Sequence, residues 1–178
     1  ERDAQVGGGR PVARHGADRR RLLHRRRRVP AVRAGAGSRG VAVHGGNIRI
    51  ENSILENNAT GGADAHYNGY IIDSQIISNG GAGFACGGYS NECAVRGSKV
   101  AHNNGEGVHM QTFDHTAPLL VEESAIVGSL NWGITGSGQY PSATIRNSTI
   151  ALNTLGGISW QTPAQGLPLL TLINSTLN

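Results

Sequence analysis

The sequence predicts an all-β fold, a right-handed parallel β-helix (solenoid) of about six coils of 21–27 residues, and three observations lead to it. A serine ends each of six short apolar runs, at intervals of 21, 24, 26, 24 and 27 residues. An apolar residue follows each serine by two positions, and an asparagine, or once a serine, follows by five. Fixed columns at a drifting period of about 20 to 30 residues are typical of a solenoid, whose stacked coils share one core.

Two polar columns define the corners of the expected coils. The serine column consists of Ser53, Ser74, Ser98, Ser124, Ser148 and Ser175. The asparagine column consists of Asn58, Asn79, Asn103, Ser129 and Asn153. The apolar runs between them are short, β-branched and interrupted by Asn, Gly and Ser, which indicates strands and turns rather than helices. We therefore expect both columns to point inward, where each side chain bonds to its own backbone and to the next coil.

A second strand is expected in every complete coil after the asparagine column, because a glycine is followed there by an apolar residue and then by alternating positions. Side chains of a strand alternate between its faces, so Ala63, Phe84, Val108, Ile134 and Ile158 should point inward. One outward row is then Asp64, Ala85, His109, Thr135 and Ser159, and the next is His66, Gly87, Gln111, Ser137 and Gln161. These ten outward residues are called the polar strip, and chemistry is expected there.

The formal charge of +4 combines two unlike parts of the 178-residue chain. Residues 1–40 hold 12 arginines against three acids, a net charge of +9, whereas residues 41–178 carry −5. We interpret 1–40 as an Arg-rich segment that is disordered, artefactual or a degraded cap, and 41–178 as the β-helix domain, truncated at its C-terminal end. No aromatic residues are interleaved with the arginines, so nucleic-acid binding is not favoured. No apolar run is long enough to span a membrane.

Two cysteines, Cys86 and Cys93, lie seven residues apart. They fit a disulfide that closes a small loop, which would suit a secreted or extracytoplasmic protein. Two buried free thiols are an equal alternative, because Cys86 falls on an inward position. The spacing does not resemble that of a zinc site, and no metal site is predicted.

The candidate catalytic residues are grouped on the polar strip. Asp64 and His66 are two positions apart on one strand and therefore share a face, and His109 follows two coils later, about 10 Å away. Histidine is a suitable general base near neutral pH, and a neighbouring carboxylate fixes its tautomer. Tyr67 or Tyr70 would supply a phenolic acid. The candidate substrate-binding residues are Gln111, Asp114, His115, Ser137 and Gln161. The alternative is a surface Asp–His pair without a role.

The segment Asp64-Ala65-His66, with residues 73–84 and 100–108, resembles the catalytic coils of mannuronan C5-epimerases. More broadly it is similar to β-helical polysaccharide lyases. The resemblance implies that the proton at C5 of a uronic acid is abstracted, with His66 and Asp64 matching the histidine and aspartate of the family motif. The family also has Arg-His before the glycine of a later strand, where this chain has Glu106. Arg96 and Arg146 fall in another column, where a charge ladder with Glu51 and Glu122 is expected.

The function expected from these observations is modification of a polyuronate such as alginate by C5 epimerisation. The alternatives are a polysaccharide lyase of the same fold and a non-catalytic carbohydrate-binding or adhesive β-helix, in which Trp132 and Trp160 would be stacking platforms. No cofactor is required, but Ca²⁺ held between carboxylates and substrate would offset the acidic charge of the folded part. A polysaccharide is the expected partner, and an end-to-end oligomer through uncapped coils is a further expectation.

Overall fold

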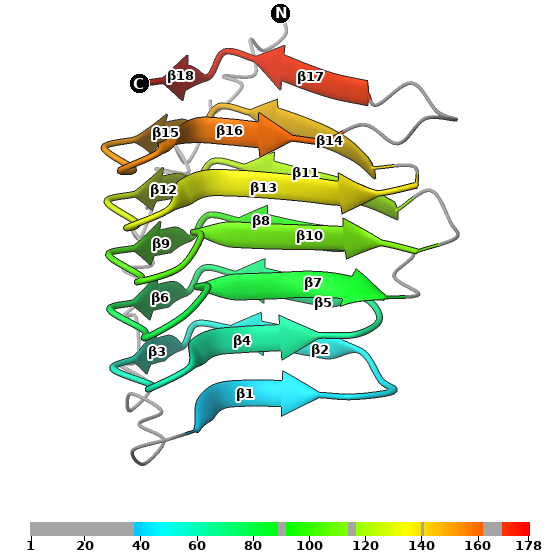
Figure 1. Cartoon of the computed structure of the whole chain (residues 1–178), viewed down its shortest axis with the longest axis vertical. Coiled ribbons are helices and arrows are strands. Elements are labelled where there is room, and N and C mark those ends of the chain that lie inside the picture. The colour runs from blue at the N-terminus through cyan, green and yellow to red at the C-terminus, as the bar shows by residue number, and fades with distance from the viewer. Residues whose placement is uncertain (1–37, 89–91, 114–116, 140, 162–168) are drawn as a thin grey trace, which may run out of the picture.

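A computed structural model of the chain describes residues 38–88, 92–113, 117–139, 141–161 and 169–178. The strands in these residues form three parallel sheets of six strands each, which confirms the predicted all-β solenoid (Figure 1). Sheet 1 consists of β1 (Arg39–Val43), β4 (Gly61–Ala65), β7 (Phe84–Gly88), β10 (Val108–Thr112), β13 (Trp132–Gly138) and β16 (Gly156–Trp160). Its first strand begins at Arg39, two residues before the expected start of the domain.

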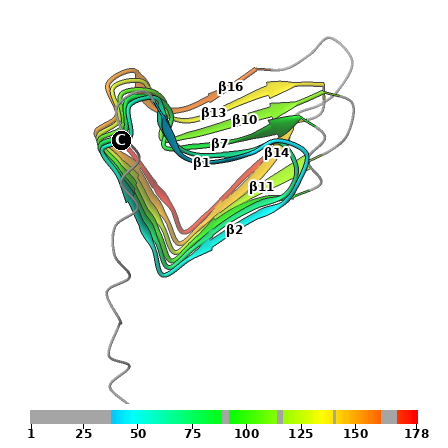
Figure 2. The same cartoon turned by 90° about the horizontal axis from the view of Figure 1, so that it is seen from below.

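The other two sheets complete each coil. Sheet 2 consists of β2 (Ile48–Glu51), β5 (Gly69–Ile72), β8 (Cys93–Arg96), β11 (Ala117–Glu122), β14 (Pro141–Arg146) and β17 (Leu169–Ile173). Sheet 3 consists of β3 (Ile54–Glu56), β6 (Gln75–Ile77), β9 (Lys99–Ala101), β12 (Ala125–Val127), β15 (Thr149–Ala151) and β18 (Thr176–Leu177). Figure 2 shows the three sheets as the sides of a roughly triangular cross-section. In both views the chain advances from sheet 1 through sheets 2 and 3 with a right-handed turn.

The serine column stacks as predicted at the corner between sheets 2 and 3. The backbone N–H of Ser74 donates to Oγ of Ser98 at 3.0 Å, and that of Ser98 donates to Oγ of Ser124 at 3.1 Å. Each hydroxyl in turn donates to the backbone carbonyl two residues earlier, as Ser98 does to Arg96 at 2.7 Å. The corner residue before each serine has a positive φ between 46° and 55°, a conformation that Asn, Asp and Gly tolerate best.

The asparagine column stacks at the corner between sheets 3 and 1. The side-chain amide of Asn79 donates to Oδ1 of Asn103 at 2.9 Å, and Asn79 accepts equivalent bonds from Asn58. Ser129 interrupts this ladder, because its buried Oγ has no hydrogen-bond partner among the described residues. A glycine opposite each ladder member allows close packing: a Cβ on Gly83 would lie 2.5 Å from Cγ1 of Val100 and 2.6 Å from Nδ2 of Asn103. This contact explains why a glycine lies within one residue of the start of each of the first five strands of sheet 1.

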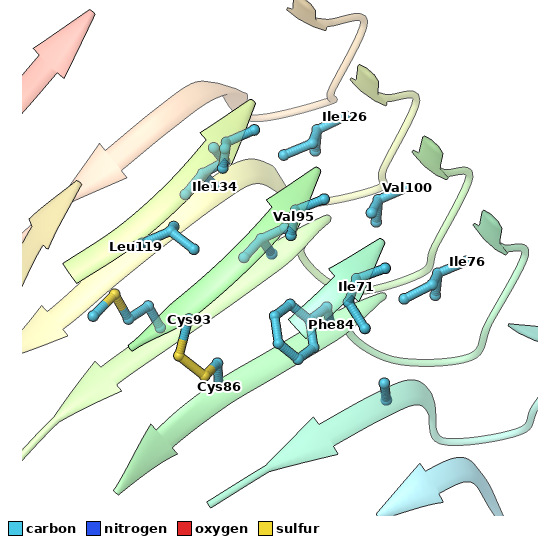
Figure 3. Close-up of a cluster of buried hydrophobic side chains, with 14 of the residues drawn as sticks. Ile71, Ile76, Phe84, Cys86, Cys93, Val95, Val100, Leu119, Ile126 and Ile134 are labelled. Carbon is cyan, nitrogen blue, oxygen red and sulfur yellow. A yellow bond between two sulfur atoms is a disulfide. The ribbon is translucent and has the colours of Figure 1, made fainter. Parts of the chain in front are cut away.

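The inward positions of all three sheets form one continuous apolar core (Figure 3). Phe84, Val108 and Ile134 of sheet 1 are fully buried, as their alternation predicts, and Ala63 is 3% exposed. Cys86 and Cys93 are joined by a disulfide with a Cα–Cα distance of 6.4 Å, so the alternative of two free thiols is wrong. The disulfide ties β7 of sheet 1 to β8 of sheet 2 inside one coil (Figure 3). It therefore ties β7, one of the strands that carry the polar strip, to sheet 2.

Candidate functional site

The polar strip lies on the outer face of sheet 1, in the register that the repeat predicts. Asp64 pairs with Ala85, Ala85 with His109, His109 with Thr135, and Thr135 with Ser159. In the neighbouring row Gly87 pairs with Gln111 and Gln111 with Ser137. The strip is therefore a straight surface along the axis of the solenoid, with its residues separated by the coil spacing of about 4.8 Å.

A first hollow of about 270 Å³ lies over β7. Its floor is formed by Ala85, which has a methyl side chain, and Gly87, which has none, so the outer face of that coil is not filled. Asp64 and His66 line one side, and residues of β10 line the other. The two walls are two coils apart, about 10 Å between backbones, which leaves room for one sugar ring. The lining residues are Arg39, Asp64, His66, Ala85, Cys86, Gly87, Gly88, His109, Gln111 and Phe113.

Arg39 supplies a cation to this hollow that sequence reasoning missed. Its guanidinium forms an ion pair with the carboxylate of Asp64, which is 14% exposed against 45% for the arginine. The sequence prediction places Arg39 in the Arg-rich segment 1–40, outside the repeating coils, whereas the structure places it in the first strand of sheet 1. The spacing of 22 residues between Arg39 and Gly61, which are partners in the register of β1 and β4, was the signal that would have assigned it to sheet 1.

His66 is paired with a second histidine, His44, in the turn after β1. Nδ1 of His44 lies 3.0 Å from Nε2 of His66, and the rings are perpendicular, with centroids 4.4 Å apart. One ring nitrogen must donate in this hydrogen bond and the other must accept. The bond is therefore lost if both imidazoles are doubly protonated. His44 was also missed, although it precedes His66 by 22 residues, the same interval that separates Arg39 from Gly61.

His109 stands between the first hollow and a second one. Its Nδ1 lies 2.8 Å from Oγ1 of Thr135, which fixes the ring and leaves Nε2 for a ligand. The second hollow, of about 260 Å³, extends over β13. Its lining residues are Glu106, His109, Trp132, Thr135, Gly136, Ser137, Ser159 and Gln161. Ser137 and Gln161, predicted as substrate-binding residues, therefore belong to the second hollow, and Gln111 belongs to the first.

The remaining predicted residues do not join these hollows. Tyr67 is 36% exposed and lines neither of them. Asp114 and His115 lie outside the described residues.

Phe113, which was not predicted, is 50% exposed and lines the first hollow. Its position directly after a strand that carries the polar strip, in a chain with 4% aromatic residues, was the available signal.

The two tryptophans have different surroundings. Trp160 packs against the core, and its indole N–H donates to the carbonyl of Pro141 at 3.2 Å. It is therefore not a surface platform. Trp132 is on the outer face of β13 and lines the second hollow.

The outer face of sheet 2 carries the part of the predicted charge ladder that involves Glu122, whereas Glu51 pairs with Arg49 of its own strand. Glu122 accepts from Arg146 at 2.6 Å and lies 3.7 Å from Nε of Arg96. Tyr70 of β5 donates to Oε2 of Glu92 at 3.1 Å. Desolvation raises the pKa of the Tyr70 phenol above its ordinary value of 10.0, and the bond to Glu92 raises it further. Tyr70 is therefore bound to a carboxylate on sheet 2 and is not an acid for the polar strip.

Neither a cluster of metal-ligating side chains nor a membrane-spanning helix occurs in the described part of the chain. No three side chains of His, Cys, Asp or Glu gather there in a way that would hold a metal ion. Ca²⁺ held jointly by protein and substrate carboxylates stays a prediction. Nor do the described residues include a helix with the length and apolarity needed to cross a bilayer.

Comparisons of the chain with protein-family models, with curated proteins and with solved structures found no match.

Proposed function

We propose that the outer face of sheet 1 binds a polysaccharide and that the first hollow exchanges the C5 proton of a uronate unit. The observation that supports this most directly is the position of two histidines on opposite sides of one hollow. His66 lines the β4 side, His109 lines the β10 side, and the small residues of β7 leave the space between them open. An acid and a base on opposite faces of a sugar are what C5 epimerisation requires.

In the proposed reaction, neutral His66 accepts the C5 proton of the bound uronate. The electron pair of the broken C–H bond moves into the adjacent carboxylate, which becomes a dianionic enolate. Arg39 is the cation in this hollow that can offset the new charge. Its guanidinium has five N–H donors, so it can hold a substrate carboxylate while it keeps a bond to Asp64.

His109, in its protonated form, then completes the reaction from the other side. If it returns a proton to C5 from the opposite face, the product is the C5 epimer. If the C4–O bond breaks instead, the electron pair leaves with that oxygen, which takes the proton, and the reaction is a lyase elimination. The hydrogen bond between Nδ1 of His109 and Oγ1 of Thr135 fixes the ring of His109 in either case, and the protonated ring donates in it.

Incubation in D₂O tests this proposal. The purified protein is mixed with polymannuronate, polyguluronate or polygalacturonate, with and without Ca²⁺. Deuterium at C5 is followed by NMR, and the unsaturated uronate end that a lyase creates is followed by its ultraviolet absorbance. Deuterium incorporation that is lost in His66→Ala is expected. Absence of both signals with every polymer would contradict the catalytic proposal.

A non-catalytic carbohydrate-binding β-helix is the second candidate, because the charged and titratable groups of the first hollow already have partners. Asp64 is paired with Arg39, and His66 is bonded to His44. Binding of an oligosaccharide without deuterium exchange would favour this candidate.

A further inference from the structure

The second hollow differs from the first in its charge. The ionisable side chains that line it are Glu106 and His109, and Glu106 accepts a hydrogen bond from the amide of Asn131 at 3.1 Å. Among the described residues that line it there is no lysine or arginine, whereas the first hollow contains Arg39. A uronate carboxylate placed there would meet the like charge of Glu106 and would have no guanidinium from these residues to bind it.

The second hollow also contains an aromatic side chain that is held in place. Trp132 pairs in register with Gly156 of the next coil, and a Cβ on Gly156 would lie 2.6 Å from Cζ3 of the indole. The ring therefore covers the space that a side chain of β16 would occupy. The backbone N–H of Trp132 donates to Oδ1 of Asn131, at 3.0 Å, the residue that also binds Glu106. A partly exposed, immobilised indole beside hydroxyl and amide groups is suited to a ring with one apolar face and polar edges.

We infer that the second hollow is a subsite for an uncharged sugar ring that stacks on Trp132, with Glu106 excluding a uronate from that position. Ser137, Ser159 and Gln161 line the same hollow as the indole and supply donors and acceptors for sugar hydroxyls. This inference rests on the proposed polysaccharide-binding role of sheet 1 and deepens it. The natural ligand would then contain neutral sugars as well as uronates, which differs from a pure polyuronate.

Tryptophan fluorescence provides a direct readout, because the chain has two tryptophans and one of them is in the core. In the Trp160→Phe variant the emission reports on Trp132 alone. Neutral cello-, manno- and xylo-oligosaccharides are each titrated against oligomannuronate and oligoguluronate at low salt. At least one neutral series should quench or shift the emission saturably, and the oligouronates should need an at least tenfold higher concentration. Glu106→Gln should remove that difference.

Two results would overturn the inference. One is an equal response to neutral and uronate oligomers in the Trp160→Phe protein, and the other is no response to any neutral oligomer. If Trp160→Phe does not fold, the wild-type emission is compared with Trp132→Phe instead. Failure of the proposed catalysis would appear separately, as absence of C5 deuteration with an intact response of Trp132.

Discussion

Sheets 1 and 2 are built from the same coils, yet their outer faces use polar residues differently. On sheet 2 the outward side chains pair with one another, as in Arg96, Glu122 and Arg146, and the surface is closed. On sheet 1 the outward row contains Ala85 between Asp64 and His109, so large polar residues stand on either side of an open floor. The same backbone therefore yields a self-neutralised face and a hollowed face, and the hollowed face is the one that we propose binds a ligand.

The largest effect is expected from removing the histidines of the hollowed face. His66→Ala and His109→Ala should each lower C5 proton exchange by about 10²-fold or more, the range that general acid–base groups contribute. Glu122→Gln, on the closed face, should leave the exchange rate unchanged. Exchange is measured by NMR in D₂O. Full activity in His66→Ala would remove that residue from the proposed mechanism.

Filling the first hollow should weaken ligand binding without unfolding the protein. In Ala85→Leu the larger side chain points outward over β7 and occupies the space of the sugar ring. Affinity for an oligosaccharide should fall at least about tenfold, which corresponds to a loss of about 1.4 kcal/mol. The matched control is Thr144→Leu, an outward position on β14 of sheet 2. Equal binding by both variants in calorimetry would place the ligand elsewhere.

The fold was predictable from the sequence because its signals are local and repeated. Each serine and asparagine occupies the same corner in successive coils, so six copies of one pattern fixed the register. The rows of the polar strip followed from strand alternation alone. Arg39 and His44 were missed because they precede the first serine, where a single partial copy had no repeat before it. The first hollow exists because Ala85 and Gly87 have no large side chain to fill the outer face of β7. Which polar side chains pair with one another could not be predicted from the sequence.

The asparagine column at the corner between sheets 3 and 1 should govern stability rather than binding. Asn103→Ala removes the acceptor for Asn79 and a donor to the carbonyl of Ile76, at 3.2 Å, in a buried site. A loss of about 1–3 kcal/mol in the free energy of unfolding is expected. Ser129→Asn should change stability in the opposite direction, by about 1 kcal/mol, because it extends the ladder opposite Gly107. Urea unfolding measures the stability of both variants. Destabilisation by Ser129→Asn would contradict the expectation that an asparagine at position 129 completes the ladder.

The charge ladder of sheet 2 should contribute little. Glu122→Gln is expected to lower the free energy of unfolding by no more than about 1 kcal/mol, since its arginine partners are 45% exposed and screened by solvent. The difference from wild type should shrink in high salt. A larger, salt-independent loss would mean that the face is not a solvated ladder.

A smaller pH effect is expected at Tyr70. Its pKa is raised in the folded state, so the associated stability is present below pH 10.0 and is lost as the pH rises through the folded pKa. Wild type and Tyr70→Phe should therefore converge in stability as the pH rises from 10.0 through the folded pKa. Urea unfolding across this range checks it, and parallel curves for the two proteins would exclude the effect.

The central claim, that ligand binds the outer face of sheet 1, is tested most directly by NMR of the histidine C2–H signals. His102 is an internal reference, because it is exposed at the corner between sheets 3 and 1, with its ring over Gly128. Signals are assigned with single His→Gln variants, and an oligosaccharide that binds in calorimetry is titrated into the protein. The account predicts that the signals of His66 and His109 shift saturably while that of His102 does not. A shift of His102 alone, or an equal shift of all three, would contradict it.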